Sequence, residues 1–148
     1  MDQIDRDLLT HLQTNATTPY ATLAEHIGLS TAATHERVRK LRDQGVIRAT
    51  TIDIDPELVG RPVLAYITLD ANTWMGGPET AEALQALPWL QEAHITAGTA
   101  TILVKLRATS TQDLQNALKH LHDIPGVTRT TTTVVLETIF ERPVNPHA

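Results

Sequence analysis

The chain has 148 residues and contains no cysteine. This absence excludes a disulfide framework, a thiol nucleophile and a thiolate metal site. Aromatic residues make up only 3% of the sequence, and no apolar run is long enough to cross a membrane. The N-terminus, MDQIDRDLL, is acidic and amphipathic rather than a basic signal peptide. Together with 41% hydrophobic residues, these features predict one ordinary or two small globular domains, with the cytoplasm as the default location.

The net charge of −5 argues against a protein coated in basic residues, but it permits a local basic patch. Residues 36–48 form such a patch, because they contain five cations and only two anions. Salt screens charge over about 10 Å, so the local balance decides whether phosphate is attracted. The patch favours nucleic-acid binding, although a solvated helix surface with partly offset charge has the same composition.

Residues 20–42 predict two short helices around a tight turn. Pro19 suits the first position of the first helix after a Thr18 cap, and Gly28 suits its left-handed end. Ser30 is placed to cap the second helix. The inner face of that helix carries Thr34, Val38 and Leu41. The outer face is small, polar and basic, which is typical of a DNA-reading helix-turn-helix, with an ordinary helical hairpin as the alternative.

A further helix is expected at residues 2–13, with Asp2 as its cap and Asp5 at the reciprocal position. Residues 46–47 are apolar and follow a glycine, so they are expected to form a closing strand or wing. The first part of the chain, residues 1–49, is therefore predicted to be a winged helix-turn-helix domain.

The second half of the chain alternates between strand and helix patterns. Residues 50–61 predict a linker that contains an extended strand and a hinge. Strands are expected at 63–69, 90–97, 101–108 and 127–140, and helices at 79–87 and between Ser110 and Pro125. The resulting order, β-α-β-β-α-β over residues 62–142, is the ferredoxin-like arrangement. The fold class is therefore α+β, its open sheet face predicts self-association, and residues 143–148 are expected to form a tail.

Several motifs occur in a fixed order along the chain. They are DQIDRDLLTHLQ at the start, LAEHIGLS and RVRKLRDQGVIR around the predicted turn, IDPELVG in the linker, AGTATILVKL in the sheet and IPGVTRTTTTVVLE near the end. Their order and spacing resemble the leucine-responsive/asparagine-regulator (Lrp/AsnC) family of transcription factors over nearly the whole length.

The resemblance implies a winged helix-turn-helix joined to a C-terminal effector-sensing and oligomerisation domain. Family members form dimers, commonly assembled into tetramers or octamers, and many respond to amino acids. The implied partners are double-stranded DNA, a small-molecule effector such as an amino acid, and further copies of the chain. No cofactor and no metal are expected.

DNA contact is predicted along the start and outer face of the second motif helix. The residues are Ser30, Thr31, Ala32, Ala33, His35, Glu36, Arg37, Arg39, Lys40 and Arg42. Small residues at the N-terminal end permit close approach to the major groove, where Ala33, His35 and Glu36 are the candidates for base edges. The cations are the candidates for phosphate, and the resemblance supports Arg37 in particular. For each arginine, the alternative is a surface cation paired with a nearby acid.

The resemblance also implies an effector site between subunits, near the loop that joins the second and third strands of the sensing domain. The predicted effector-binding residues are Gly98, Thr99, Ala100, Thr101 and Thr132. The family often has an acid at the position of Thr101 and commonly another just after the glycine, where this chain has Thr99. A carboxylate is the natural partner of an ammonium group, so the two threonines leave a different small molecule, a weakly bound amino acid or no effector as alternatives.

Two other classes of function are weighed against this one. A branch related to the family decarboxylates haem precursors, but the seven histidines are scattered, and no nucleophile–base pattern, phosphate loop or carboxylate pair stands out. His120 and His122 are two residues apart on a helix and do not share a face, so they make a poor metal pair. The other class is an interaction module that co-assembles with homologues without binding DNA. Salt-dependent DNA binding separates it from a transcription factor.

Overall fold

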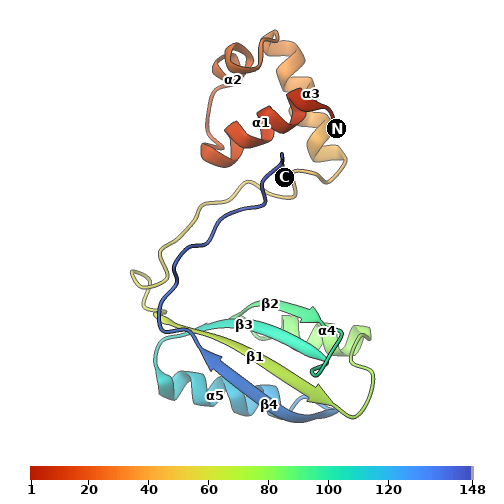
Figure 1. Ribbon diagram of the computed structural model, residues 1–148, viewed down its shortest axis with the longest axis vertical. Coiled ribbons are helices and arrows are strands. Elements are labelled where there is room, and N and C mark those ends of the chain that lie inside the picture. The colour runs from red at the N-terminus through yellow and green to blue at the C-terminus, as the bar shows by residue number, and fades with distance from the viewer. Residues whose placement is uncertain (148) are drawn as a thin grey trace. The chain divides into compact units, whose positions relative to one another are not determined.

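The computed structural model describes residues 1–147, which fold as two compact units (Figure 1). Unit 1 consists of Met1–Asp53 together with the chain from Phe140 onward, and unit 2 is Ile54–Ile139. The tail expected at residues 143–148 therefore belongs to unit 1 in its described part, and Ala148 lies outside the described residues.

Unit 1 contains three helices: α1 (Gln3–Thr14), α2 (Tyr20–Ile27) and α3 (Thr31–Asp43). The predicted capping box begins α1. The Asp2 carboxylate accepts the Asp5 backbone N–H at 2.9 Å, and the Asp5 carboxylate accepts the Asp2 backbone N–H at 3.0 Å. Two N–H groups that the helix leaves unpaired are satisfied in this way, so the start of α1 is fixed locally.

The turn between α2 and α3 also follows the sequence pattern. Gly28 adopts φ 69°, and the Ser30 hydroxyl accepts the backbone N–H of Ala33 at 3.2 Å. The start of α2 differs from the prediction, because Pro19 occupies the cap position. The Thr18 hydroxyl donates to a carbonyl in the preceding turn instead of capping the helix.

Side chains from all three helices meet at the centre of unit 1. Its core contains Leu8, Leu23, Val38 and Leu41, with Leu9, Leu12, Tyr20, Ile27 and Ile47 packed around them. Thr34 is fully buried, and its hydroxyl donates to the backbone carbonyl of Ser30 at 3.0 Å. The predicted inner face of the second motif helix is confirmed, so the opposite face of α3 is the exposed one.

The predicted strand or wing at residues 46–47 was wrong. The backbone N–H groups of Val46 and Ile47 both donate to the carbonyl of Leu41, which closes the end of α3 around Gly45 at φ 71°. With these donors engaged, no partner strand is bound, and residues 44–62 contain no strand in the described structure. Ile47 instead packs against the core of unit 1.

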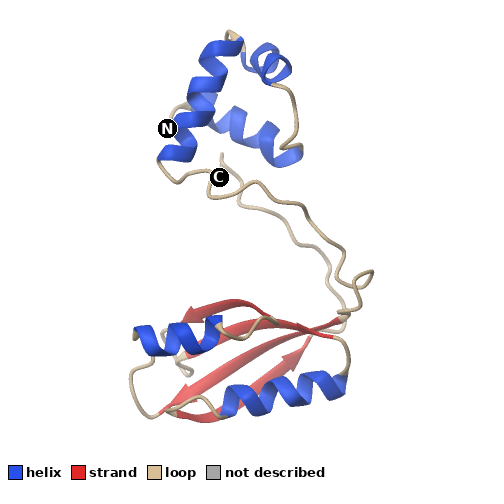
Figure 2. Cartoon of the chain, turned by 180° about the vertical axis from the view of Figure 1, so that it is seen from behind, coloured by secondary structure: helices blue, strands red, loops and turns tan. Residues whose placement is uncertain are grey.

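Unit 2 is a four-stranded antiparallel sheet with two helices. Its elements are β1 (Val63–Ala71), α4 (Pro78–Gln85), β2 (Leu90–Ile95), β3 (Ile102–Ala108), α5 (Thr111–His122) and β4 (Val127–Val134). The strand order is β2-β3-β1-β4, and both helices cover the same face (Figure 2). This confirms the α+β class and the βαββαβ order. None of the helices described over residues 1–147 is long and apolar enough to cross a membrane.

The core of unit 2 lies between the sheet and its helices. The two central strands alternate, so that Ile67 of β1 and Val104 of β3 are fully buried and belong to the same core cluster as Leu121 of α5. The last strand is shorter than predicted and ends at Val134. One further bond, from the Val135 N–H to the Leu64 carbonyl, follows it, and β1 begins at Val63, so the predicted continuation to residue 140 has no strand to pair with in the described structure.

Candidate nucleic-acid interface and effector site

The N-terminal end of α3 presents small side chains. Ser30, Thr31 and Ala32 are exposed and Ala33 is half-buried. The Ser30 cap fixes the first turn, so these residues stand on a rigid element. A helix end with short side chains can approach base edges in the major groove closely.

His35 is held on the outer face of α3 by an aromatic contact. Its ring lies 4.8 Å from the Tyr20 ring between centroids, at an interplanar angle of 58°. Tyr20 begins α2 and packs against the core of unit 1. The imidazole is therefore oriented by the first motif helix while it remains exposed.

Glu36 and Arg39 form a two-bond ion pair on the surface of α3. The distances are 2.6 Å from Arg39 Nη2 to Glu36 Oε1 and 3.0 Å from Nε to Oε2, and Asp43 accepts from Nη1 at 3.1 Å. The hydrogen bond from Arg39 holds the pKa of Glu36 below its usual range. Because all three side chains are exposed, solvent weakens the pairs and DNA can compete for each group.

Arg37 is directed away from the outer face of α3 toward the start of α1. Its Nη1 lies 2.8 Å from Asp2 Oδ2 and 2.7 Å from Asp5 Oδ1. Hydrogen bonds to these carboxylates, first Asp2 and then Asp5, raise the pKa of the guanidinium. The Asp5 side chain is only 15% exposed. A phosphate contact by Arg37 would require breaking a double ion pair within unit 1.

The cations of α3 therefore divide into two groups. Arg37 and Arg39 are paired with carboxylates of the chain. Lys40 and Arg42 are exposed, and within residues 1–147 neither forms an ion pair or a side-chain hydrogen bond. Arg48, which the sequence places in the basic patch, is exposed and unpaired in the same sense. These cations are available to phosphate without first losing a partner in the chain.

The predicted effector loop, residues 97–101, joins β2 to β3 as a tight turn. The Thr96 hydroxyl donates to the Ala100 carbonyl at 2.7 Å, and the Thr101 backbone N–H donates to the Leu69 carbonyl at 3.0 Å. Gly98 and Thr99 are exposed, and Ala100 and Thr101 are half-buried. Hydroxyl groups and backbone, rather than a carboxylate, are what this loop offers a ligand.

The structure does not bring Thr132 to that loop within one chain. Thr132 lies on β4 opposite Ile67 of β1, while the loop continues into β3 on the other side of β1. Directly opposed residues share a sheet face, so Thr132 stands on the face that the helices cover. A ligand contacting both Thr132 and the loop would need residues from a second copy.

A cavity of about 390 Å³ lies between α4 and β2. Its apolar lining includes Leu84, Leu90 and Ile95, and its polar lining includes Thr80 and Gln85. None of the five predicted effector residues lines it. Within the described residues, no group of three or more histidines and acids is placed to hold a metal ion.

The sequence analysis missed the two acids that hold Arg37. Asp2 and Asp5 were interpreted as the cap of α1 alone, and each also binds the arginine 35 or 32 residues away. The signal was the concentration of acid at the very start of the chain, which exceeds what one cap requires. The contacts of the C-terminal tail were missed as well.

Comparison with known proteins agrees with this architecture. Residues 1–42 match the AsnC-type helix-turn-helix domain, and residues 63–145 match the Lrp/AsnC ligand-binding domain. The chain belongs to the Lrp/AsnC family. The predicted family and fold class are thereby confirmed, and this Lrp/AsnC protein is a transcriptional regulator with a ligand-binding domain.

Similar proteins match over almost the full chain. The HTH-type transcriptional regulator FL11 of Pyrococcus horikoshii is 36% identical over 93% of this chain and 91% of its own. The regulatory protein AsnC of Escherichia coli K12 is 31% identical over 99% of this chain and 97% of its own. The solved structure of E. coli AsnC has a TM-score of 0.91, at 31% identity and 99% coverage of both chains.

A further solved structure carries a ligand. It is a feast-or-famine regulatory protein from M. tuberculosis complexed with L-methionine, with a TM-score of 0.89 and 27% identity over 98% of this chain and 99% of that one. The relatives are named as a transcriptional regulator and a regulatory protein. The interaction module and the haem-precursor decarboxylase therefore have no support in these comparisons.

Proposed function

We propose that this regulator binds specific double-stranded DNA through α3 as a homo-oligomer, and that a small-molecule effector tunes its assembly or DNA affinity. The observation that carries the DNA part is the outer face of α3, which combines a small, capped N-terminal end with two unpaired cations, Lys40 and Arg42. Action on chromosomal DNA would place the protein in the cytoplasm.

The residues of α3 take different roles in this proposal. Ala33, His35 and Glu36 face base edges, with Ser30, Thr31 and Ala32 permitting the close approach. Lys40 and Arg42 contact phosphate, and Arg39 joins them when DNA replaces its exposed carboxylate partners. Arg37 acts as a positioning residue, because its carboxylate partners fix α3 against α1.

The DNA-binding proposal is tested by fluorescence anisotropy with the promoter DNA upstream of the gene that encodes this protein. The titration is repeated over a series of salt concentrations, with scrambled DNA as the control. Specific binding is expected to weaken steeply with salt. Lys40→Ala and Arg42→Ala should each weaken binding to all sequences and reduce the salt slope by about 0.9 per copy bound. Lys119→Ala, an exposed cation on α5, is the matched control with the same change in net charge.

Failure to bind both the promoter and random genomic fragments at low salt would overturn the DNA part and favour an interaction module. Equal effects of Lys119→Ala and Lys40→Ala would show that net charge, rather than the outer face of α3, governs binding.

For the effector, we propose a site at residues 97–101 that a second copy completes with Thr132. Support comes from the placement of these residues within one chain, where β1 separates them. Ligand binding at such a joint favours one assembly over another only if the two assemblies bind it with different affinity. A screen of amino acids and other metabolites by the same anisotropy assay, with light scattering for assembly, tests this. Binding that changes neither quantity would contradict it.

A further inference from the structure

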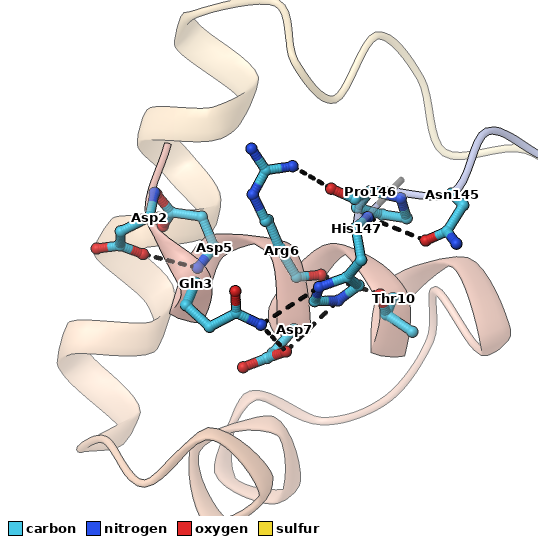
Figure 3. Close-up of polar contacts among 9 residues, drawn as sticks. All are labelled: Asp2, Gln3, Asp5, Arg6, Asp7, Thr10, Asn145, Pro146 and His147. Atoms are coloured by element: carbon cyan, nitrogen blue, oxygen red, sulfur yellow. Dashed lines mark hydrogen bonds and ion pairs between the residues drawn. The ribbon is translucent and has the colours of Figure 1, made fainter.

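The described C-terminal residues dock onto α1 of unit 1 (Figure 3). Residues 144–147, Val-Asn-Pro-His, are called the strap here. The Gln13 amide donates to the Val144 carbonyl at 2.9 Å, and Arg6 Nη1 donates to the Pro146 carbonyl. The chain therefore leaves unit 1 after Asp53 and returns to it at Phe140.

A side-chain contact completes the docking. His147 lies with Nδ1 3.3 Å from the Gln3 amide nitrogen and Nε2 3.5 Å from the Asp7 carboxylate. Its backbone N–H donates to the Asn145 side chain at 2.9 Å, which closes a local turn. The strap is thus held by backbone carbonyls and by one imidazole.

The surface that receives the strap is one stripe of α1. Gln3, Arg6, Asp7, Thr10 and Gln13 follow the three-and-four spacing that puts residues on one side of a helix. Four of these side chains contact the strap: Arg6 and Gln13 donate to its carbonyls, and Gln3 and Asp7 lie against its imidazole. A helix surface of long donors suits an extended segment whose carbonyls point outward.

The sequence of the strap fits that role. Pro143 precedes it and Pro146 lies within it, and each proline favours an extended conformation in the residue before it, which leaves carbonyl groups free for other donors. Proline also reduces the conformational freedom that the segment loses when it binds.

We propose that the strap is a second, non-covalent tie by which unit 2 restrains the DNA-binding unit, so that unit 1 is joined to unit 2 at both ends of residues 54–139. The strap contacts α1 and leaves the start of α3 uncovered, so it restrains the reading helix without blocking it. The restraint limits which half-site spacings one assembly accommodates. This role rests on the proposed DNA-binding function, whereas the docking itself does not.

Crosslinking tests the docking directly, because the chain has no cysteine to interfere. Thr10→Cys places one cysteine on the receiving stripe. Val144→Cys places the other on the strap, at an exposed residue that binds α1 through its backbone carbonyl, so the substitution keeps that hydrogen bond. In the full chain, a short bis-maleimide is expected to join this pair within one chain. The control pair keeps Val144→Cys and moves the other cysteine to exposed Glu25 of α2, by Glu25→Cys.

Three results decide the docking. An intrachain crosslink in the strap pair, absent from the control pair, supports it. Equal crosslinking of both pairs overturns it, as does an interchain product, which would place the strap on another copy. Adding Gln3→Ala, Arg6→Ala and Gln13→Ala should lower the intrachain yield about tenfold, because three polar contacts are lost.

DNA spacing tests the restraint. Inserting about 5 base pairs, half a helical repeat, at the centre of the bound promoter site should weaken binding by the unchanged chain about tenfold. A chain ending at Arg142, which keeps all of α1, should discriminate less between the two DNAs. Equal discrimination would overturn the restraint. If the unchanged chain bound no DNA at all, the proposed function would be contradicted. The crosslinking experiment would still test whether the strap docks onto α1.

Discussion

The guanidinium of Arg37 lies 2.7 Å from the carboxylate of Asp5, which joins the helix proposed to read DNA to the first helix of the chain. The contact is partly shielded, with the arginine side chain 31% and the aspartate side chain 15% exposed. Lys40, three residues along the same helix, is exposed and has no such partner within the described residues. Two cations of one basic patch thus have different physical roles.

Arg37→Ala and Lys40→Ala are expected to separate stability from DNA binding. Arg37→Ala removes both ion pairs and leaves Asp5 without a cation, so unit 1 should lose about 1 kcal/mol of unfolding free energy. Lys40→Ala should change stability by less than about 0.5 kcal/mol and weaken DNA binding instead. Urea unfolding followed by circular dichroism, with anisotropy on the same samples, measures both. If Arg37→Ala had the same unfolding free energy as the unchanged chain, Arg37 would again be a candidate for contact with phosphate.

Gly28→Ala is expected to destabilise unit 1 through backbone strain alone. Gly28 has φ 69°, and a Cβ there would meet nothing within 4 Å, so the only cost is the left-handed conformation, about 1 kcal/mol. Gly28→Asn should cost less, since asparagine tolerates this conformation. Glu25→Ala is the control, because it introduces alanine at an exposed helical position of α2, three residues before Gly28. Thermal unfolding of the three variants gives the comparison, and an equal loss in Glu25→Ala would rule out this explanation.

The contribution of Arg37 should disappear in acid. The backbone N–H of Asp5 and the Arg37 guanidinium hold the pKa of Asp2 below its usual value of 3.8. A carboxylate with a lower pKa in the folded state stabilises the fold above its unfolded pKa, and that stability is lost as the pH falls through the folded pKa. We expect the stability gap between the unchanged chain and Arg37→Ala to stay constant from about pH 7 to 5 and to shrink below about pH 4.

Urea unfolding at a series of pH values measures that gap. Gly28→Ala supplies the control, because its cost comes from backbone conformation and should not depend on pH. A gap between the unchanged chain and Arg37→Ala that did not shrink at all as the pH fell below about 4 would show that the arginine stabilises unit 1 by packing rather than by charge.

The parts of the fold predicted correctly from sequence are those fixed by neighbouring residues. The capping pair Asp2 and Asp5, the left-handed Gly28 and the Ser30 cap each act within one helical turn. Apolar periodicity then identified the inner face of α3 and the alternating strands of unit 2. Each of these signals is contained in a short window of sequence.

The errors and omissions concern partners that are distant in sequence. Residues 46–47 have strand-forming side chains, but their N–H groups are used by the end of α3. The strand-like sequence pattern of the final segment continues well beyond Val134, but β1 begins at Val63, so within the described residues only one further backbone bond to β1, from the Val135 N–H to the Leu64 carbonyl, follows. Arg37 and the strap bind side chains that are 32 to 144 residues away in sequence. The sequence does not indicate which distant partner a charged group or a carbonyl will bind. The candidate effector residues stay a prediction, since one chain does not bring them together.

The threonines of the effector loop lead to a prediction about ligand charge. Thr101 is half-buried at the end of the loop and offers a hydroxyl where the family often has an acid. A carboxylate would form a charge-assisted hydrogen bond with an ammonium group, worth about 1.5 to 3 kcal/mol. Thr101→Asp should therefore strengthen amino-acid binding about tenfold or more. Isothermal titration calorimetry with a panel of amino acids measures it.

Thr133→Asp is the matched control for that experiment. Thr133 is an exposed residue of β4 opposite Tyr66 of β1, outside the predicted site, and the substitution changes the net charge equally. If both variants gained affinity alike, the added charge would act at long range rather than at residues 97–101. If neither gained affinity, the ammonium group would not lie near Thr101. Gain in Thr101→Asp alone would mean that the pocket occupies the same place as the family's, with an altered preference for ligand charge.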